Sequence, residues 1–148
     1  MNLLTVNNLG VDFNVEGTTV HAVKSASLSV EKGETVALVG ESGSGKSVTA
    51  LSVLQLLPYP RASHPQGSVC FDGEELIGAL PERLRALRGG RVAMIFQEPM
   101  TSLNPLHSIE RQLSETLILH RAVSSEEARG RTIELLKLVG LTNVEQRL

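Results

Sequence analysis

Residues 40–47 have the spacing in this sequence that most strongly suggests chemistry. They read Gly-Glu-Ser-Gly-Ser-Gly-Lys-Ser and fit the pattern G-x-x-x-x-G-K-[ST]. Glycines let a backbone approach a ligand closely, and successive N–H groups can then point inward as a nest for an anion. A lysine and a hydroxyl that end such a loop suit nucleotide phosphates and Mg²⁺. The pattern predicts that Lys46 reaches the β- and γ-phosphates and that Ser47 places its hydroxyl on the metal.

The residues on either side of this loop predict the elements that must position it. Residues 35–39 form a short continuous apolar run, typical of a strand buried on both faces of a parallel sheet. After the loop, apolar residues at threefold spacing predict a helix that Pro58 stops: Val48, Leu51 and Leu54, with Leu57 beyond. A helix N-terminus adds positive charge where the phosphates would lie. The alternative, a plain Gly/Ser-rich turn, leaves Lys46 and Ser47 unexplained.

Other parts of the chain predict a mixed α/β arrangement. Period-two alternation over residues 9–15 and 25–30 predicts two half-buried strands of an antiparallel sheet, with a turn at 14–18. Residues 68–71 predict a strand before an Asp-Gly turn, and Val92-Ala93-Met94-Ile95-Phe96 predicts a second buried strand. Pro81 can open a short helix that ends at a Gly-Gly pair.

The last third of the chain has helical patterns. Ile109, Leu113 and Leu117 lie four residues apart on one face of a predicted helix. Ser124 and Glu127 have the spacing of a capping box, and the helix they begin is expected to end at Gly140. Thr142 and Glu145 repeat this spacing, so a third helix is expected from Asn143.

Composition excludes several classes of protein. The 148 residues are 41% hydrophobic and 20% charged, with a formal net charge of −2, which argues against disorder and against a basic nucleic-acid footprint. Cys70 is the only cysteine, so no intramolecular disulfide framework is possible. The first residues do not have the pattern of a signal peptide, and no apolar stretch reaches the roughly 18 residues of a membrane span.

Two stretches resemble a known family. Residues 40–58, GESGSGKSVTALSVLQLLP, and residues 94–105, MIFQEPMTSLNP, resemble the ATP-binding subunits of ABC transporters. The likeness is to the peptide-importer branch, which covers dipeptide, oligopeptide and microcin C uptake, and it runs over the whole chain. It implies a P-loop NTPase core of α/β class, with an N-terminal antiparallel β subdomain and the start of a helical subdomain.

The resemblance assigns roles to individual residues. Gln97 matches the Q-loop glutamine, which would contact Mg²⁺ or the attacking water, and Lys46 is the second expected catalytic residue. Phe13 falls where the family has an aromatic residue stacked on adenine, although its alternation with Leu9 and Val11 also fits a core position. The expected ATP-binding residues are Phe13, Gly40, Glu41, Ser42, Gly43, Ser44, Gly45, Lys46, Ser47 and Val48, and the expected Mg²⁺ ligands are Ser47 and Gln97.

The resemblance also implies partners and a location. Residues 98–120 match the region that faces the transmembrane permease subunits, although an ordinary surface loop and helix would read the same way. A second ATP-binding domain is expected in a head-to-tail dimer, and a periplasmic or extracellular solute-binding protein is expected as an indirect partner. The subunit would be peripheral to the cytoplasmic face of the plasma membrane.

Some family motifs are not in the sequence. The resemblance implies an LSGGQ-type signature, a Walker B aspartate with a catalytic glutamate, and a switch histidine after residue 148. No run of four apolar residues is followed by Asp-Glu. We therefore expect a truncated, N-terminal portion of one ATP-binding domain that binds Mg-ATP without hydrolysing it. The apolar run at 35–39 would then have an uncovered edge, which favours association.

Within that domain we expect three parts: residues 1–34, mainly antiparallel β; residues 35–97, the phosphate-loop core with a β-hairpin; and residues 98–148, the Q-loop and the start of the helical subdomain. Two other classes stay open at this stage. One is a regulatory or DNA-maintenance P-loop protein, which would need a coiled-coil insertion or basic patch that is not visible. The other is a non-enzymatic interaction module, which ATP titration would separate.

Overall fold

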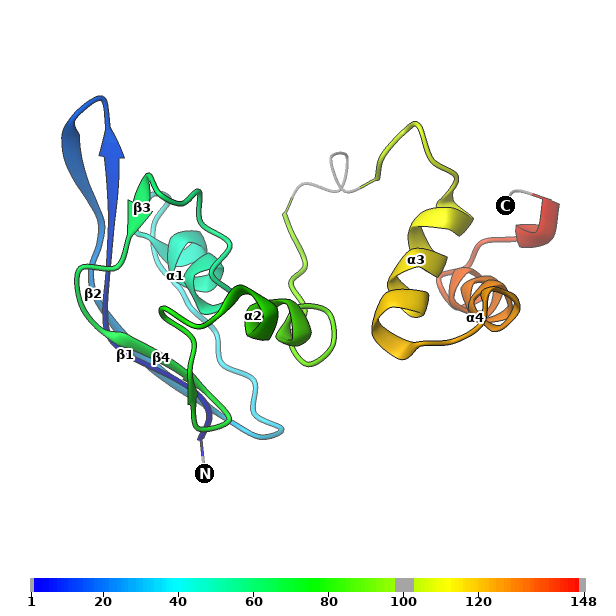
Figure 1. The fold of residues 1–148 in the computed structure, drawn as a ribbon, viewed down its shortest axis with the longest axis horizontal. Helices are drawn as coiled ribbons and strands as arrows, with labels where there is room; N and C mark the ends of the chain where they lie inside the picture. Colours follow the sequence, from blue (N-terminus) through cyan, green and yellow to red (C-terminus); the bar gives the residue numbers. More distant parts are fainter. Residues whose placement is uncertain (1, 98–102, 147–148) are drawn as a thin grey trace. The chain divides into compact units, whose positions relative to one another are not determined.

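The computed structural model describes residues 2–97 and 103–146. The chain divides into two compact units, residues 1–85 and residues 86–148, and each is described by itself (Figure 1). The three-part domain organisation expected from the sequence stays a prediction. Among the described residues, no helix combines the length and the apolar character needed to cross a membrane.

The first unit is built on a five-stranded antiparallel sheet with the path β2-β1-β4-β5, and β3 pairs with the far end of β1. Two long strands form its hairpin, and Glu16 and Gly17 turn the chain between them with positive φ. This confirms the antiparallel pair predicted from period-two alternation. The strands are β1 (Asn2–Val15), β2 (Thr18–Glu31), β3 (Ala62–Ser63), β4 (Ser68–Phe71) and β5 (Glu74–Glu75).

Helix α1 (Lys46–Val53) packs against β1 and β2 and covers the apolar face of the hairpin (Figure 1). Val6, Leu9 and Val11 of β1 are fully buried in this core. The two buried residues of α1 itself are polar. Their hydroxyls donate to carbonyls one turn back, Thr49 to Gly45 at 2.9 Å and Ser52 to Val48 at 2.8 Å, so burial leaves neither hydroxyl unsatisfied.

Helix α1 is shorter than the apolar spacing predicts. It ends at Val53, and Gln55 then adopts a left-handed conformation with φ of 51°. The predicted apolar residues Leu54 and Leu57 are nevertheless buried, so the apolar spacing identified core positions but not the helix end. A helix cannot continue through a left-handed residue, and Pro58 follows too late to be the cause.

The two buried strands predicted at residues 35–39 and 92–96 are wrong. Both segments are irregular, with Val39 85% and Ile95 98% exposed, and only an isolated bridge joins Val92 to Arg88. A strand buried on both faces needs hydrogen-bonded neighbours and two covering layers. Within the described residues, neither segment pairs with a strand, so apolar character alone does not make a sheet.

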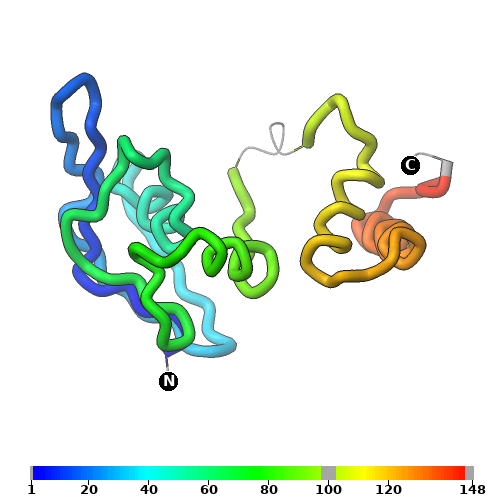
Figure 2. The backbone as a smooth tube through the Cα atoms, viewed as in Figure 1, coloured from blue at the N-terminus to red at the C-terminus, as the bar shows by residue number. Residues whose placement is uncertain are grey.

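The second unit contains a helical hairpin of α3 (Ile109–Arg121) and α4 (Ser125–Leu138), joined by Ala122 in a left-handed conformation. Figure 2 shows the backbone of this hairpin and of the loop that leads into it. Across the hairpin, Ser114 and Thr132 share a hydrogen bond of 3.3 Å. Helix α2 (Pro81–Leu87) begins at the predicted proline, at the junction of the two units.

The helix boundaries in this unit follow the predicted signals closely. Ser124 and Glu127 form the predicted capping box at the start of α4. The two hydrogen bonds to Ser124 lower the pKa of the Glu127 carboxyl. Gly140 follows the end of α4 with a positive φ of 83°, as predicted for a helix stop. The helix expected from Asn143 is a single 3₁₀ turn, η2 (Val144–Gln146).

Candidate functional site

The phosphate loop is exposed and leads directly into α1, as the sequence predicts. Gly43 and Gly45 both have positive φ, at 80° and 90°, a conformation that residues with a Cβ adopt rarely. Gly45 also lies against β2: a Cβ atom there would stand 2.9 Å from the Ala22 carbonyl oxygen and 2.9 Å from a Val23 methyl group. The end of the loop is therefore held on the sheet by a contact that only glycine permits.

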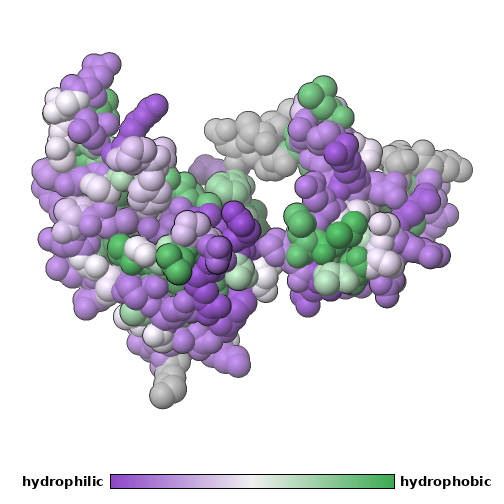
Figure 3. Space-filling model, viewed as in Figure 1, coloured by the Kyte–Doolittle hydropathy of each residue, from purple (hydrophilic) through white to green (hydrophobic). Residues whose placement is uncertain are grey.

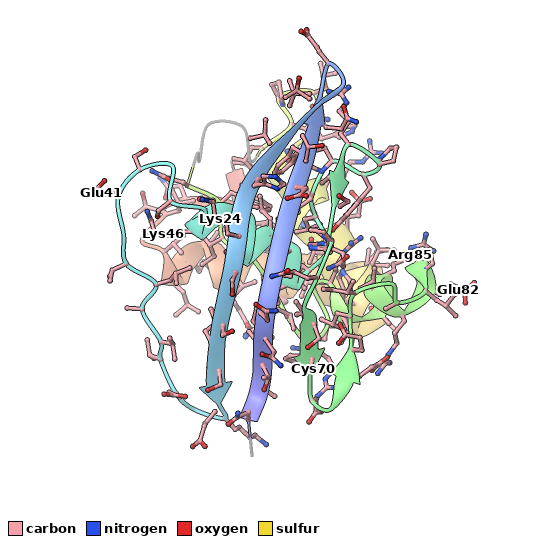
Figure 4. The ribbon with its side chains drawn as sticks, turned by 90° about the vertical axis from the view of Figure 1, so that its left-hand side faces the viewer. Lys24, Glu41, Lys46, Cys70, Glu82 and Arg85 are labelled. Carbon is pink, nitrogen blue, oxygen red and sulfur yellow. The ribbon has the colours of Figure 1, made fainter. Side chains whose placement is uncertain are left out.

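The side chain of Lys46 bends back over the loop. Its ammonium group donates to the carbonyl oxygens of Gly40 at 2.7 Å and Glu41 at 2.6 Å, with Ser44 Oγ at 3.3 Å. Figure 4 shows Lys46 along the inner side of the curved loop, with the Glu41 side chain pointing away from it. The loop therefore concentrates positive charge on its concave side and keeps its only carboxylate outside.

The start of α1 completes a cradle suited to an anion. The first N–H groups of any helix have no acceptor within the helix, and here they belong to Lys46, Ser47 and Val48. The positive end of the helix dipole lies at the same place. Ser47 is exposed one residue into α1, so its hydroxyl is accessible to a metal bound to phosphate. The donors present therefore fit a nucleotide phosphate chain and the hydroxyl-liganded Mg²⁺ that accompanies it.

Phe13 lies on the same hairpin that supports the phosphate loop. It is half-buried on β1, opposite Val20 of β2 and Ala62 of β3. It therefore presents part of its ring to solvent, and both the stacking role and the core role stay open. Phe13 and residues 40–48 belong to the same compact unit. A single nucleotide that contacts Phe13 and the phosphate loop would therefore lie within this unit.

The other predicted site residues lie in the second unit. Gln97 is exposed at the end of the described segment 86–97, so its approach to a metal on Ser47 stays a prediction. Of the segment 98–120, residues 98–102 lie outside the described residues. The remainder forms a loop and α3, which borders a groove of about 460 Å³. The groove is lined by Ser108, Glu110, Arg111, Ser114, Glu115, Ile118, Leu119 and Ser125.

The sequence did not predict two side chains that each bond to several backbone groups, Glu75 and Gln112. Glu75 of β5 accepts from the backbone N–H groups of Val69 at 2.9 Å and Ile77 at 2.8 Å. Burial of the Cys70 thiol raises the pKa of that group, and the hydrogen bond and negative charge of Glu75 raise it further. Gln112 holds the backbone before α3. Neither residue is part of a recognisable motif, because their partners are backbone groups set by the fold.

Comparison with known proteins gives the same class as the geometry. The sequence profile of the ABC transporter family matches residues 23–148. The ATP-binding cassette MJ0796, solved as a dimer after hydrolysis with ADP and Pi bound, superposes with a TM-score of 0.79 at 26% identity. That alignment covers 95% of this chain and 58% of the MJ0796 chain.

Curated relatives align along almost the whole chain. The chain is 60% identical over 147 residues to the peptidoglycan transport ATP-binding protein YejF of Agrobacterium fabrum, covering 99% of this chain and 27% of that protein. It is 41% identical over 146 residues to the oligopeptide transport ATP-binding protein OppD of Bacillus subtilis, covering 99% of this chain and 41% of that protein. The chain thus spans less than half the length of these relatives.

The loop, its lysine and the helix that follows define a P-loop nucleotide-binding fold. With the family profile matching most of its length, the chain belongs to the ABC transporter family, as its sequence resemblance implies.

Proposed function

We propose that this chain is the nucleotide-binding part of the ATP-binding subunit of an ABC importer for peptides or peptide-like compounds. The observation that carries the proposal is the phosphate loop, in which the Lys46 ammonium, the left-handed glycines Gly43 and Gly45 and a helix N-terminus meet. ATP is the expected ligand, with Phe13 against the base and residues 40–48 around the phosphates. The names of the relatives support the substrate class. The resemblance of residues 94–113, MIFQEPMTSLNPLHSIERQL, to microcin C importers supports a microcin C type compound.

In this proposal Mg²⁺ supplies charge neutralisation on the β- and γ-phosphates when it is bound. Ser47 and Gln97 are its protein ligands, one a hydroxyl and the other an amide oxygen that does not titrate. On nucleotide binding, the Lys46 ammonium would donate to phosphate oxygens in place of the carbonyl oxygens of Gly40 and Glu41. Phosphoryl transfer depends mainly on positioning and charge stabilisation. We propose that this chain alone binds Mg-ATP without turnover, since its sequence contains no signature motif and no Walker B carboxylates.

The partners follow from the same proposal. Residues 98–120 would face the transmembrane permease subunits, and a second ATP-binding domain would complete the site in a head-to-tail dimer. The dimeric MJ0796 structure supports the pairing. A solute-binding protein outside the membrane would deliver the substrate to the permease, and this subunit would sit on the cytoplasmic face of the plasma membrane.

The test is the affinity for ATP of Lys46→Ala, measured by titration calorimetry with Mg²⁺ present. Losing a charge-assisted contact costs roughly 1.5–3 kcal/mol, so affinity is expected to fall about 10- to 100-fold. Lys32→Ala, which removes an exposed lysine outside the loop, is the matched control and should bind as the parent does. Unchanged affinity in Lys46→Ala would overturn the proposal, and a measured ATPase rate that disappears in this variant would overturn the absence of turnover.

A further inference from the structure

The pairing of β1 with β2 is irregular at the place where the phosphate loop contacts the sheet. Val11 of β1 lies opposite Val23 of β2. The next residue of β1, Asp12, lies opposite His21, which is two residues from Val23. One step along β1 therefore corresponds to two steps along β2, and Ala22 is the extra residue of a β-bulge. A bulge leaves its extra residue outside the regular ladder and bends the strand.

The phosphate loop contacts this extra residue. A Cβ atom on Gly45 would stand 2.9 Å from the Ala22 carbonyl oxygen and 2.9 Å from a Val23 methyl group, so the loop backbone lies directly against the bulge. The Gly45 carbonyl in turn accepts from the N–H of Thr49 at 2.8 Å, in the first turn of α1. The position of the bulge therefore determines where α1 begins, and with it the place of Lys46.

A side-chain pair joins the two strands immediately beside the bulge. His21 Nδ1 lies 2.8 Å from Asp12 Oδ1, and because a carboxylate only accepts, the imidazole is the donor. The Asp12 side chain is 16% exposed and lies between two strands, since Ser63 of β3 is its partner on the other side. The hydrogen bond therefore ties His21, the residue directly before Ala22, to a point that is fixed on both sides.

Apolar packing ends close to the bulge. Val11 and Val23 are buried and Phe13 is half-buried, whereas residues 14–21 are all exposed. Figure 3 shows mainly hydrophilic surface over this end of the hairpin, which lies at the top of β1 and β2 in Figure 1. The core therefore stops where the bulge begins, and the side-chain pair lies at the boundary, where packing no longer holds the two strands in register.

We propose that Asp12 and His21 are positioning residues of the nucleotide site. Their hydrogen bond fixes the bulge at Ala22, and the bulge places the end of the phosphate loop and the start of α1. The inference rests on the proposed function, in which this loop holds the phosphates. An exposed pair contributes little to the stability of the whole fold. Its effect is expected at the phosphate loop, because the loop contacts the residue that the pair positions.

The experiment compares variants for ATP affinity, by titration calorimetry with Mg²⁺, and for amide hydrogen exchange in α1 without nucleotide. Asp12→Ala and His21→Ala each remove the hydrogen bond, whereas Asp12→Asn is nearly isosteric and keeps an oxygen acceptor. Thr19→Ala is the matched control. Thr19 is also an exposed residue of β2, and it lies opposite Asn14 in the regular part of the ladder beyond the bulge.

We expect Asp12→Ala and His21→Ala each to weaken ATP affinity about three- to fivefold, which is the most that an exposed pair can supply. The double variant should be no worse than either, because the two side chains share one hydrogen bond. Exchange in residues 46–53 should be faster in both, since the Thr49 amide bonds to the Gly45 carbonyl. Asp12→Asn should behave as the parent does, and all melting temperatures should match that of Thr19→Ala.

Three results would contradict the inference. If the parent binds ATP and both alanine variants bind it equally well, the inference fails and the proposed function stands. If affinity falls while exchange in α1 is unchanged, the pair acts through the neighbouring Phe13 and not through Gly45. If the alanine variants melt well below Thr19→Ala with unchanged ATP affinity, the role of the pair is merely structural.

A parent protein that does not bind ATP would refute the proposed function, and the inference would fail with it. Should Asp12→Ala not fold, His21→Ala alone decides the outcome. Its side chain is 64% exposed, so truncation there removes the hydrogen bond with little loss of packing.

Discussion

His64 lies where a titratable group is partly removed from water. Its Nδ1 faces the Gly10 carbonyl oxygen of β1 at 3.3 Å, and its Nε2 lies 2.6 Å from the Tyr59 hydroxyl. Burial lowers the pKa of His64, and the hydrogen bond to Gly10 opposes this in part. The folded protein therefore favours the neutral imidazole, in which Nδ1–H can donate to Gly10.

This lowered pKa predicts a stability that depends on pH. The unfolded chain takes up a proton on His64 near pH 6.5, before the folded chain does, so the free energy of unfolding decreases as pH falls below that value. Urea unfolding at pH 7.5 and pH 5.5 measures the decrease, and His64→Gln should reduce it. An identical pH dependence in His64→Gln would contradict this account.

For single residues, the sequence predicts a role where the residue acts together with its neighbours in the chain. Lys46, Ser47 and the glycines between positions 40 and 45 are predicted because their function depends on local spacing. His64 is not predicted, since its partner Gly10 lies 54 positions away. The hydrogen bonds of Gln112 are not predicted for another reason. Its partners are close in sequence, but they are backbone groups of a turn, and backbone groups leave no pattern in residue types.

At Gly45, the loop before α1 makes a close contact with β2. Gly43 provides a natural comparison, because it has nearly the same φ but no atom within 4 Å of the place a Cβ would occupy. A Cβ at position 43 would therefore meet only the backbone cost of a left-handed residue, about 1–2 kcal/mol. A Cβ at position 45 would also press on Ala22 and Val23.

We expect Gly45→Ala to lower the free energy of unfolding clearly more than Gly43→Ala does, by an additional 1–3 kcal/mol or roughly the cost of overpacking. It should also weaken ATP binding more strongly, because the helix N-terminus must move away from β2. Denaturant unfolding and ATP titration of the two variants measure both effects. Equal losses in the two variants would mean that strain at positive φ, and not the contact with β2, requires glycine at position 45.

At the scale of elements, helices were predicted better than buried strands. The capping box at Ser124, the start of α2 at Pro81 and the stop at Gly140 are all local signals, and all are confirmed. Residues 35–39 and 92–96 failed because a strand exists only with hydrogen-bonded neighbours. The β1–β2 hairpin succeeded because its two partners are adjacent in the chain and joined by a short turn.

The exposed apolar segment at residues 35–39 has a consequence for the whole molecule in solution. Val36, Leu38 and Val39 are all exposed in the first unit. Exposed apolar segments with free backbone groups favour pairing between chains. We expect the isolated chain to self-associate, and Leu38→Lys with Val39→Lys to shift it toward monomer by charge and reduced apolar surface. Sedimentation velocity over a range of concentrations measures this, and a parent chain that stays monomeric throughout would contradict it.

The contact between Gly45 and β2 has one more consequence, for the nucleotide. Phe13 and the phosphate loop are mounted on the same hairpin, one on β1 and the other against Ala22 and Val23 of β2. If Phe13 stacks on the base, the β1–β2 hairpin would set the separation between the residue that contacts the base and the residues that contact the phosphates.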